Sequence, residues 1–385
     1  MKKFFTYPVF VVLFFHLCYN LEIINPTNIN WIMSVYHDWG QHYLGWAFYR
    51  NDPWTFPLGS IESYNYPVGT NIGFMDSIPL LGLLFKPFSS ILPDDFQYLG
   101  IWLFICTYFV AFYTKKILQL YNVSNWIIIL AVILMIANPV LLFRSIHPAL
   151  SAHFLILGSI YNYLRPSLGI PTKINRNQVF LFFIAATVNP YIMVMIFGFN
   201  VILPFKHFWI EKTINLKQFI TYPILSIVLF IITWILLGMI EFNGETNVSA
   251  VEPFSNFSFN LNSFFDSYGY YSKLIPDLGR INPSQYEGFA YLGIGMMGLI
   301  LFAIFYLIFV FSKTSLQSIL FKKWGILLIL CLGLFLFSIT NVLSFGNKTL
   351  LTLPLLSIIE KLGFIFRASG RFVWPFYYLL FIGSI

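Results

Sequence analysis

The chain has 385 residues, of which 58% are hydrophobic and 10% are charged, with a formal net charge of +7. About a quarter of the residues of a soluble globular protein are charged, so this composition excludes that class and predicts a polytopic membrane protein with an all-α fold. The basic residues lie in short connections between apolar runs, which marks them as topology signals and not as a nucleic-acid-binding surface. All three cysteines lie inside apolar runs, so we expect no disulfide framework and no CxxC metal pair.

The first apolar run extends from about Phe5 to Tyr19, and Lys2 and Lys3 before it place its start in the cytoplasm. A signal peptide begins in the same way, but no small-residue cleavage site follows this run, so we expect an uncleaved first span. The next segment, residues 21–95, carries more acidic than basic residues and is expected to face outward.

Residues 36–50, within this outward segment, hold the densest set of acidic, imidazole and aromatic side chains in the chain. As a helix, the stretch places four residues at i, i+3, i+4 and i+8 on one face: Asp38, Gln41, His42 and Trp46. Its other aromatic residues favour a helix that lies at a membrane surface over one that spans the membrane.

A second short apolar run, residues 77–92, is interrupted by Lys86 and Pro87. If this run crossed the membrane, the basic residues after the following spans would lie outside, against the positive-inside rule. We therefore expect a juxtamembrane helix at the outer surface, with Asp76 as its N-cap residue.

The later apolar runs predict further spans at about 96–114, 125–143, 148–164, 219–240, 289–311 and 324–342, and a last one from Phe372. The run 178–205 is broken at Asn189-Pro190, which predicts two short helices or a re-entrant pair. Outward loops are expected at 241–288 and at 344–371, the second with a surface helix at 350–362.

These runs add up to about ten crossings of a transmembrane helical bundle. We expect a single transmembrane domain over residues 1–385. Because the chain stops at Ile385 inside an apolar run, we also expect it to be a piece of a longer protein.

Asp38 is the first candidate for catalysis, because an acid on a surface helix above a lipid-filled cleft can take a proton from a hydroxyl acceptor. His42, one turn later, would orient Asp38 or share a metal ion with it. The alternative is a solvated interfacial acid beside an aromatic belt. Asp76 is the second candidate acid, although N-capping explains it better. A divalent metal is compatible with these residues but is not required by them, and no set of metal ligands is predicted.

Three arginines are predicted at the outer membrane face, where the positive-inside rule disfavours them: Arg144, Arg367 and Arg371. Such residues either hold a phosphate through two hydrogen bonds or snorkel to lipid headgroups. The loop at 64–73 has the glycine and asparagine residues of a tight backbone near a ligand, which makes Tyr66 and Gly69 candidates for substrate binding. His147 is a third such candidate, although a histidine with satisfied hydrogen bonds at a helix end is the more common case.

Four stretches carry a resemblance to a known group: His37-Asp-Trp-Gly-Gln-His-Tyr-Leu-Gly-Trp46, Asn65-Tyr-Pro-Val-Gly69, Asp76-Ser-Ile-Pro79 and Phe366-Arg-Ala-Ser-Gly-Arg-Phe372. Together with the order of the expected elements, they resemble the GT-C superfamily of integral-membrane glycosyltransferases. They are similar to an uncharacterised bacterial multi-pass membrane family in that group.

The resemblance implies a polyprenyl-phosphate-linked sugar donor and transfer on the outer side of the inner (cytoplasmic) membrane. It also implies an acid in the first outward loop as general base, which corresponds to Asp38. Asp38 stands without the adjacent second acid of some GT-C families, and the C-terminal soluble domain of several of them is not within these 385 residues. The implied partners are the lipid-linked donor, membrane lipids and an acceptor that is a glycan, a lipid or a protein.

Glycosyl transfer is therefore the leading hypothesis, with Arg367 or Arg371 stabilising the departing lipid phosphate. The alternative is a multi-pass transporter or lipid flippase, which would favour ionisable groups buried in mid-span and repeat symmetry. Here the charged groups lie at span ends and no repeat is evident. A non-catalytic membrane scaffold would give no reason for Asp38 and the outer arginines to gather on one side.

Overall fold

The computed structural model describes residues 6–33, 38–166, 169–240, 254–309 and 324–385, and this part of the chain is mostly helical. We expected one domain, and the chain packs as two compact units, each of which is described by itself. Unit 1 comprises residues 1–137 and 141–244, and unit 2 comprises residues 138–140 and 245–385.

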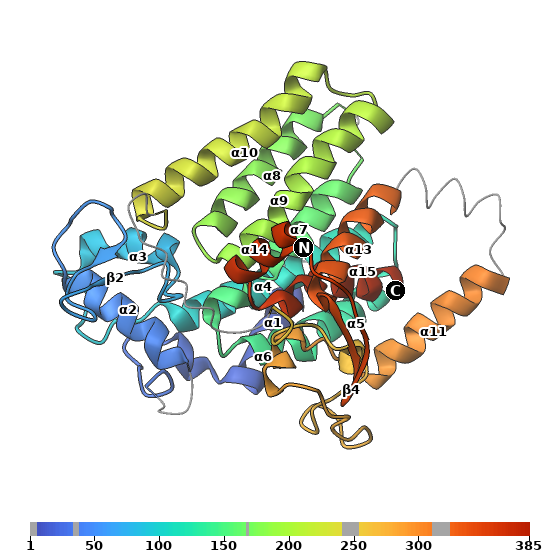
Figure 1. The fold of residues 1–385 in the computed structure, drawn as a ribbon, viewed down its shortest axis with the longest axis horizontal. Coiled ribbons are helices and arrows are strands. Elements are labelled where there is room, and N and C mark those ends of the chain that lie inside the picture. Colours follow the sequence, from blue (N-terminus) through green and yellow to red (C-terminus); the bar gives the residue numbers. More distant parts are fainter. Residues whose placement is uncertain (1–5, 34–37, 167–168, 241–253, 310–323) are drawn as a thin grey trace. The chain divides into compact units, whose positions relative to one another are not determined.

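The chain up to residue 240 is built mainly from helices (Figure 1). They are α1 (Thr6–Tyr19), α2 (Trp39–Asn51), α3 (Pro79–Phe85), α4 (Leu99–Gln119), α5 (Asn125–Ile136), α6 (Pro139–Arg144), α7 (Phe154–Leu164), α8 (Pro171–Ala186), α9 (Pro190–Phe205) and α10 (Leu216–Leu237). Short 3-10 helices are η1 (Leu21–Ile24), η2 (Lys86–Phe88) and η3 (Pro148–Ser151), and η4 (Lys206–Ile210) is a π-helix. Two short antiparallel strands, β1 (Ser60–Ile61) and β2 (Thr70–Asn71), form a hairpin.

Four helical segments in the described part of the chain are long and apolar enough to cross a membrane: Leu99–Gln119, Asn125–Arg144, Pro190–Ile210 and Leu216–Leu237. Four shorter apolar helices have 10–17 residues: Pro8–Tyr19, Pro79–Phe88, Ile294–Phe309 and Gly325–Ile339. Among the described residues, only four of the ten expected crossings therefore correspond to a helix of full length. The expected span at 148–164 shows why, since it becomes η3 and the 11-residue α7, whose side chains are nearly all buried inside the protein. Its apolar composition serves the protein core.

The break at Asn189-Pro190 is present, because residues 187–189 separate α8 from α9 as predicted. Asn189 caps α9 by accepting the backbone N–H of Tyr191, and Pro190 occupies the first helical position. The second helix is longer than predicted, since η4 continues it to Ile210.

Helices α7 to α10 are joined by a buried network of neutral polar side chains, and α8, α9 and α10 lie side by side in Figure 1. Gln178 of α8 donates to Ser159 of α7 at 2.9 Å and to Asn200 of α9 at 3.0 Å, and accepts from Asn162 of α7 at 3.1 Å. Asn200 in turn donates to Ser226 of α10 at 2.6 Å. Amide and hydroxyl bonds of this kind hold apolar helices together where the hydrophobic effect between them is weak.

Helix α2 is anchored at its C-terminal end by Arg50. The buried guanidinium donates to four backbone carbonyls of residues 89–94, at 2.6 to 3.2 Å. Trp46, one turn earlier, donates to the carbonyl of Phe96 at 2.9 Å. These bonds fix α2 against the connection that leads into α4.

The juxtamembrane helix expected at 77–92 is shorter than predicted, and Asp76 is not its N-cap. Asp76 and Ile78 have positive φ angles of 52° and 54°, so the helix begins only at Pro79, with Ile78 at the cap position. The helix ends early because Pro87 follows Lys86, and the last turn is the 3-10 helix η2. The Lys86 ammonium lies 3.9 Å from the ring centre of Tyr49, which explains how a charged residue is buried in this apolar run.

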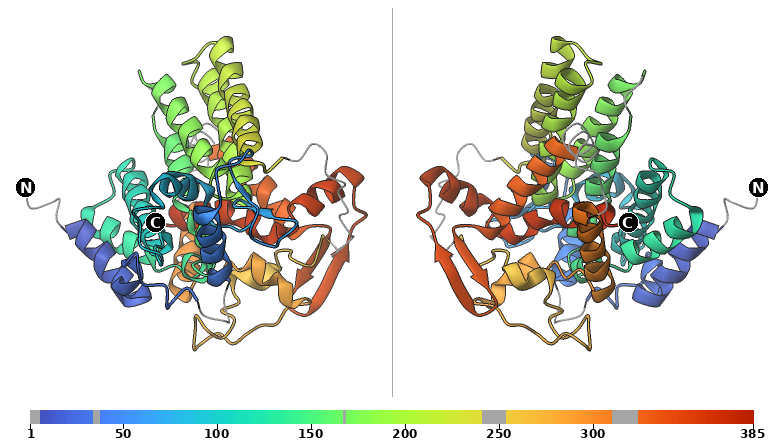
Figure 2. Two further views of the ribbon diagram at one scale, coloured as in Figure 1. Left: turned by 90° about the vertical axis from the view of Figure 1, so that its left-hand side faces the viewer. Right: turned by 90° about the vertical axis from the view of Figure 1, so that its right-hand side faces the viewer.

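Unit 2 contains the helices α11 (Ile294–Phe309), α13 (Gly325–Ile339), α14 (Ser357–Ile365) and α15 (Trp374–Gly383), with short 3-10 helices η5 (Leu261–Phe264), η6 (Pro283–Gly288) and η8 (Ser369–Val373). The strands β3 (Val342–Phe345) and β4 (Lys348–Thr352) form an antiparallel hairpin, drawn as long arrows in Figure 2. The surface helix expected at 350–362 is therefore a strand at its start and a helix only from Ser357.

A second buried polar network holds the 254–288 loop to this hairpin. Asn260 donates to Gln285 at 3.1 Å and to the carbonyl of Gly346 at 2.9 Å. Gln285 donates to the hydroxyls of Ser258 and Ser344, each at 3.1 Å. All of these polar side chains are buried, so the loop is an ordered part of unit 2 and not a solvated connection.

Candidate functional site

Asp38 lies immediately before α2, and its carboxylate is the accessible acid of the predicted site. Its side chain is 61% exposed and makes no capping bond to the helix. The carboxylate Oδ2 lies 3.4 Å from Nε2 of His147, whose side chain is only 10% exposed. Asp38 thus reaches outward with a largely buried imidazole beside one of its oxygens. The partner that the sequence suggested was His42, whereas the imidazole that lies 3.4 Å from the carboxylate is that of His147.

His42 is enclosed in the fold, and its environment fixes which ring nitrogen carries the proton. The side chain is buried, and Nδ1 lies 3.1 Å from the carbonyl oxygen of Met75. A carbonyl can only accept, so Nδ1 is the donor and Nε2 of the neutral ring is an acceptor. Nε2 is buried and has no hydrogen-bond partner among the described residues. The ring lies edge-on to that of His147, with 5.8 Å between the centres, so the two imidazoles and Asp38 form one cluster.

The turn at residues 75–78 closes around His42 from a distant part of the chain. The hydroxyl of Ser77 donates to the backbone carbonyl of His42 at 2.6 Å, while Met75 accepts from the ring. Asp76 sits between these two contacts. Its positive φ, and that of the β-branched Ile78, are conformations that such side chains rarely adopt. Strain of this kind persists where the surrounding structure holds it, and it concentrates at functional sites.

The Asp76 carboxylate is part of the cluster's framework. It accepts a hydrogen bond from the side-chain amide of Asn189 at 3.1 Å, and Asn189 also caps α9. The sequence signalled Asn189 only as a helix break. Its role as the partner of Asp76 depends on the tertiary fold, which local pattern could not show.

Gly45 shows how closely α2 approaches this turn. A Cβ atom at this position would lie 2.2 Å from the Ser77 hydroxyl and 2.6 Å from Cβ of Met75. Only glycine allows the helix to pack here, so the contact between His42 and the turn depends on Gly45.

Three further predicted residues of unit 1 lie outside this arrangement. Arg144 is fully buried, with its guanidinium 5.0 Å from the ring centre of Phe143, so it presents no fork to a lipid phosphate in this conformation. Tyr66 and Gly69 lie in the connection between β1 and β2, where Tyr66 is 83% exposed and Gly69 has a φ of 74°. Within the described residues, no contact joins either of them to Asp38, His42 or His147.

The two predicted arginines of unit 2 differ sharply from each other. Arg371 makes a two-bond ion pair with Glu287, at 2.7 and 2.8 Å, and the side chains are 11% and 4% exposed. Arg367 is exposed, and its guanidinium lies 5.4 Å from the ring centre of Phe257. The guanidinium of Arg371 is therefore bound to Glu287 within the protein, whereas the guanidinium of Arg367 is accessible to an anion.

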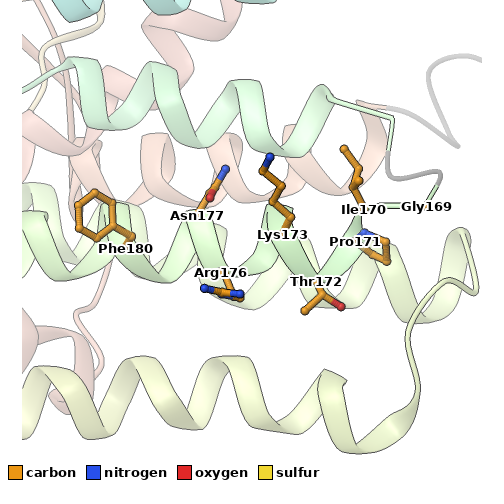
Figure 3. Close-up of a pocket in the computed structure, with 8 residues that line it drawn as sticks. All are labelled: Gly169, Ile170, Pro171, Thr172, Lys173, Arg176, Asn177 and Phe180. Carbon is orange, nitrogen blue, oxygen red and sulfur yellow. The ribbon is translucent and has the colours of Figure 1, made fainter.

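Two of the hollows in unit 1 are lined by described residues. One, of about 360 Å³, is walled by aromatic and aliphatic side chains that include Trp39, the residue after Asp38. The other, of about 670 Å³, lies along the first turns of α8 and is shown in Figure 3. Lys173 and Arg176 line it, but both are exposed and their side chains point away from each other in Figure 3. It contains none of the predicted site residues.

Within the described part of the chain, no group of three or more His, Cys, Asp and Glu residues is placed to hold a metal ion. The accessible carboxylate of Asp38 can support proton transfer.

Comparison with known proteins gives one match. A family model described as a domain of unknown function (DUF6311) matches residues 8–385, almost the whole chain. No curated protein and no solved structure matches the chain.

Proposed function

We propose that the chain, which belongs to the DUF6311 family, is a membrane-bound glycosyltransferase of the GT-C type. It transfers a sugar from a polyprenyl-phosphate donor to an acceptor hydroxyl on the outer side of the cytoplasmic membrane. The proposal joins the resemblance of the 37–46, 65–69, 76–79 and 366–372 stretches to the geometry of the Asp38 cluster.

The observation that carries the proposal is the exposed Asp38 carboxylate beside the largely buried His147, with 3.4 Å between Oδ2 and Nε2. A general base must reach the substrate's proton and must itself be oriented by a third group. Asp38 meets the first condition through its exposure, and His147 meets the second. An acid that served only to solvate the surface would need no buried imidazole at its oxygen.

In the proposed reaction, an Asp38 oxygen accepts the proton of the acceptor hydroxyl. The acceptor oxygen attacks the anomeric carbon of the donor sugar, and the bond from that carbon to the phosphate oxygen breaks. The electron pair leaves with the phosphate, so polyprenyl phosphate is the second product. The sequence assigned the leaving phosphate to Arg367 or Arg371, and of these two residues of unit 2 only Arg367 has an exposed guanidinium that could bind a phosphate.

The transporter alternative predicts ionisable groups inside the helical bundle. The buried network of α7 to α10 consists instead of neutral amides and hydroxyls that bond to one another. It has the character of a structural connection between helices. The buried ionisable residues Lys206 and His207 lie in η4 at the end of α9, where Lys206 pairs with Glu211 at 3.1 Å, so the network itself offers no ionisable step to a proton- or ion-coupled pathway.

The proposal is tested with purified protein in lipid nanodiscs and a panel of undecaprenyl-phosphate-linked monosaccharides. We expect the protein to release undecaprenyl phosphate from at least one donor when a membrane lipid extract supplies the acceptor, as measured by mass spectrometry. If no donor is consumed although the protein is folded, as judged by its thermal unfolding, the proposed function is wrong.

A further inference from the structure

The hollow of about 360 Å³ in unit 1 lies at one end of three apolar helices. Cys18 contributes to its wall from the last turn of α1, Leu103 from the first turns of α4, and Leu142 from near the end of α6. Two of these helices belong to segments long enough to cross a membrane, Leu99–Gln119 and Asn125–Arg144. The hollow therefore lies where membrane helices end, which is the level of lipid headgroups and the adjoining part of their chains.

Two tryptophans in the wall also indicate that the hollow lies at the level of the lipid headgroups. Trp31 and Trp39 lie edge-to-face with 5.3 Å between their ring centres, and the indole of Trp39 donates to the carbonyl of Ser145 at 2.7 Å. Tryptophan is enriched at the boundary between membrane and water, since its ring is apolar and its N–H needs a polar partner.

The hollow adjoins the candidate base from two sides. Trp39 in the wall directly follows Asp38, and Ile146 in the wall directly precedes His147. Asp38 and His147 are the pair joined at 3.4 Å. Asp38 and His147 therefore each directly neighbour a residue of the wall along the chain.

The chemistry of the wall selects the kind of molecule. The residues that form it are aliphatic and aromatic, with Cys18 and Ser145 as small polar exceptions, and no charged side chain is among the described residues that line it. Such a wall favours hydrocarbon and offers nothing to a phosphate or a free sugar.

We propose that this hollow binds the hydrocarbon part of a lipid acceptor, an uncharged membrane amphiphile whose headgroup hydroxyl reaches Asp38. The inference rests on the proposed glycosyl transfer and names its acceptor class. The polyprenyl chain of the donor is the other apolar candidate. The acceptor fits better, because the hollow adjoins the proton-accepting residue and none of the described residues that line it is a basic group for the donor phosphate.

Cys18 provides a direct probe of occupancy. It is exposed and lines the hollow, whereas Cys106 and Cys331 are buried. In nanodiscs, the rate of alkylation by N-ethylmaleimide is measured with and without 1,2-dioleoylglycerol, and separately with undecaprenyl phosphate. Cys18→Ala gives the background rate.

Dioleoylglycerol at about nine times its Kd should slow the alkylation of Cys18 about tenfold, because only the empty hollow reacts. Undecaprenyl phosphate should leave the rate unchanged. Alkylation should in turn raise the KM for the lipid acceptor in the wild-type protein but not in Cys18→Ala. The inference is overturned if dioleoylglycerol gives no protection, or if undecaprenyl phosphate protects in its place.

The two proposals fail in different ways. Binding needs no chemistry, so Asp38→Asn should keep the protection of Cys18 while it loses transfer. Sugar transfer without protection by dioleoylglycerol would overturn the acceptor assignment and leave the glycosyltransferase standing. Protection without transfer from any donor would overturn the glycosyltransferase.

Discussion

Single side chains decide the chemistry at the residue scale, and the two arginines of the 366–372 stretch show how differently neighbouring residues can act. Arg367 is exposed, whereas Arg371 is held by Glu287 in a buried two-bond pair. Removal of one partner from a buried pair leaves an uncompensated charge, which costs about 3–5 kcal/mol. An exposed arginine carries no such penalty.

We therefore expect Arg367→Ala to raise the donor KM without changing thermal stability, and Arg367→Lys to restore donor binding only in part, because lysine lacks the fork. Arg371→Ala should lower the stability of the protein by about 3–5 kcal/mol. Donor kinetics and thermal unfolding of the same preparations separate the two roles. Lys361→Ala, on the exposed face of α14, is the control and should change neither quantity. An unchanged donor KM in Arg367→Ala would remove Arg367 from the phosphate site.

The contact between Asp38 and His147 marks the limit of residue-level prediction. The sequence identified Asp38, because it lies among aromatic residues in the first outward segment. It assigned the orienting role to His42, because i and i+4 positions share a helix face. In the structure α2 begins after Asp38, whose exposed carboxylate makes no capping bond to the helix, while His42 is buried against Met75. His147 comes from a segment far along the chain, and no local pattern connects it to Asp38.

At the element scale, the close packing of α2 against the 75–78 turn holds the cluster together. Gly45→Ala would bring a methyl group to 2.2 Å from the Ser77 hydroxyl. Overpacking of this kind costs about 1–3 kcal/mol. We expect this variant to lower both the unfolding temperature and the transfer rate, as measured by thermal unfolding and by the donor-release assay.

Gly40→Ala is the matched control on the same helix, since its methyl group would meet nothing closer than 3.7 Å. Alanine favours a helix by about 1 kcal/mol over glycine, so this variant should be as stable as the wild type or slightly more stable. Equal effects of the two substitutions would show that helix propensity, and not the approach to Ser77, governs position 45.

Another element-scale prediction concerns the polar loop of unit 2. Burial raises the pKa of the Asp266 carboxyl. The carboxyl accepts hydrogen bonds from the backbone N–H groups of Tyr268 and Leu278, which lower the pKa by less than burial raises it. A carboxyl with a raised pKa in the folded state binds its proton more tightly when folded. Its stabilising contribution is therefore present below the ordinary aspartate pKa and is lost as the pH rises through the folded-state value.

Thermal unfolding should accordingly show stability that decreases with rising pH above about 4, and Asp266→Asn should flatten this dependence. Asparagine keeps an oxygen for the two backbone donors but has no charge to bury. The exposed Glu360, changed to Gln, is the control and should keep the wild-type profile. A wild-type slope that survives in Asp266→Asn would assign the pH dependence to other groups.

The elements that sequence predicted well are those with a local cause. Long apolar runs gave the helices α4 and α10, and Asn189-Pro190 gave the break between α8 and α9. The β3–β4 hairpin was missed because an apolar run such as 350–353 does not distinguish strand from helix. Pairing with β3 is what makes residues 348–352 a strand. Asp76 was wrongly predicted as a cap, because two residues in the left-handed region delay the start of α3 to Pro79.

At the scale of the whole molecule, the central question is how the chain lies in the membrane. The four long apolar helices support membrane association. The positive-inside rule places the 77–92 segment at the outer face and the end of α4 inside. The ten residues of Pro79–Phe88 are too few to cross the bilayer as a helix, which agrees with this arrangement.

Cysteines introduced one at a time at Asp94 and Gln119 test the topology, in a Cys18→Ala background that keeps the buried Cys106 and Cys331. Both positions are exposed and lie on either side of α4. A membrane-impermeant maleimide added to intact cells should label Asp94→Cys, while Gln119→Cys should react only after permeabilisation. Labelling of both from the same side would refute the topology.

The most direct test of the account is the transfer rate of Asp38→Asn beside that of Asp76→Asn, in purified protein with a saturating donor. A general base contributes about 10²–10⁴ in rate, so Asp38→Asn should lose activity on this scale while its unfolding temperature stays that of the wild type. Asp76→Asn should keep most of its activity, because asparagine tolerates a positive φ and still accepts the bond from Asn189. Near wild-type transfer by Asp38→Asn would contradict the account, whatever Asp76→Asn does.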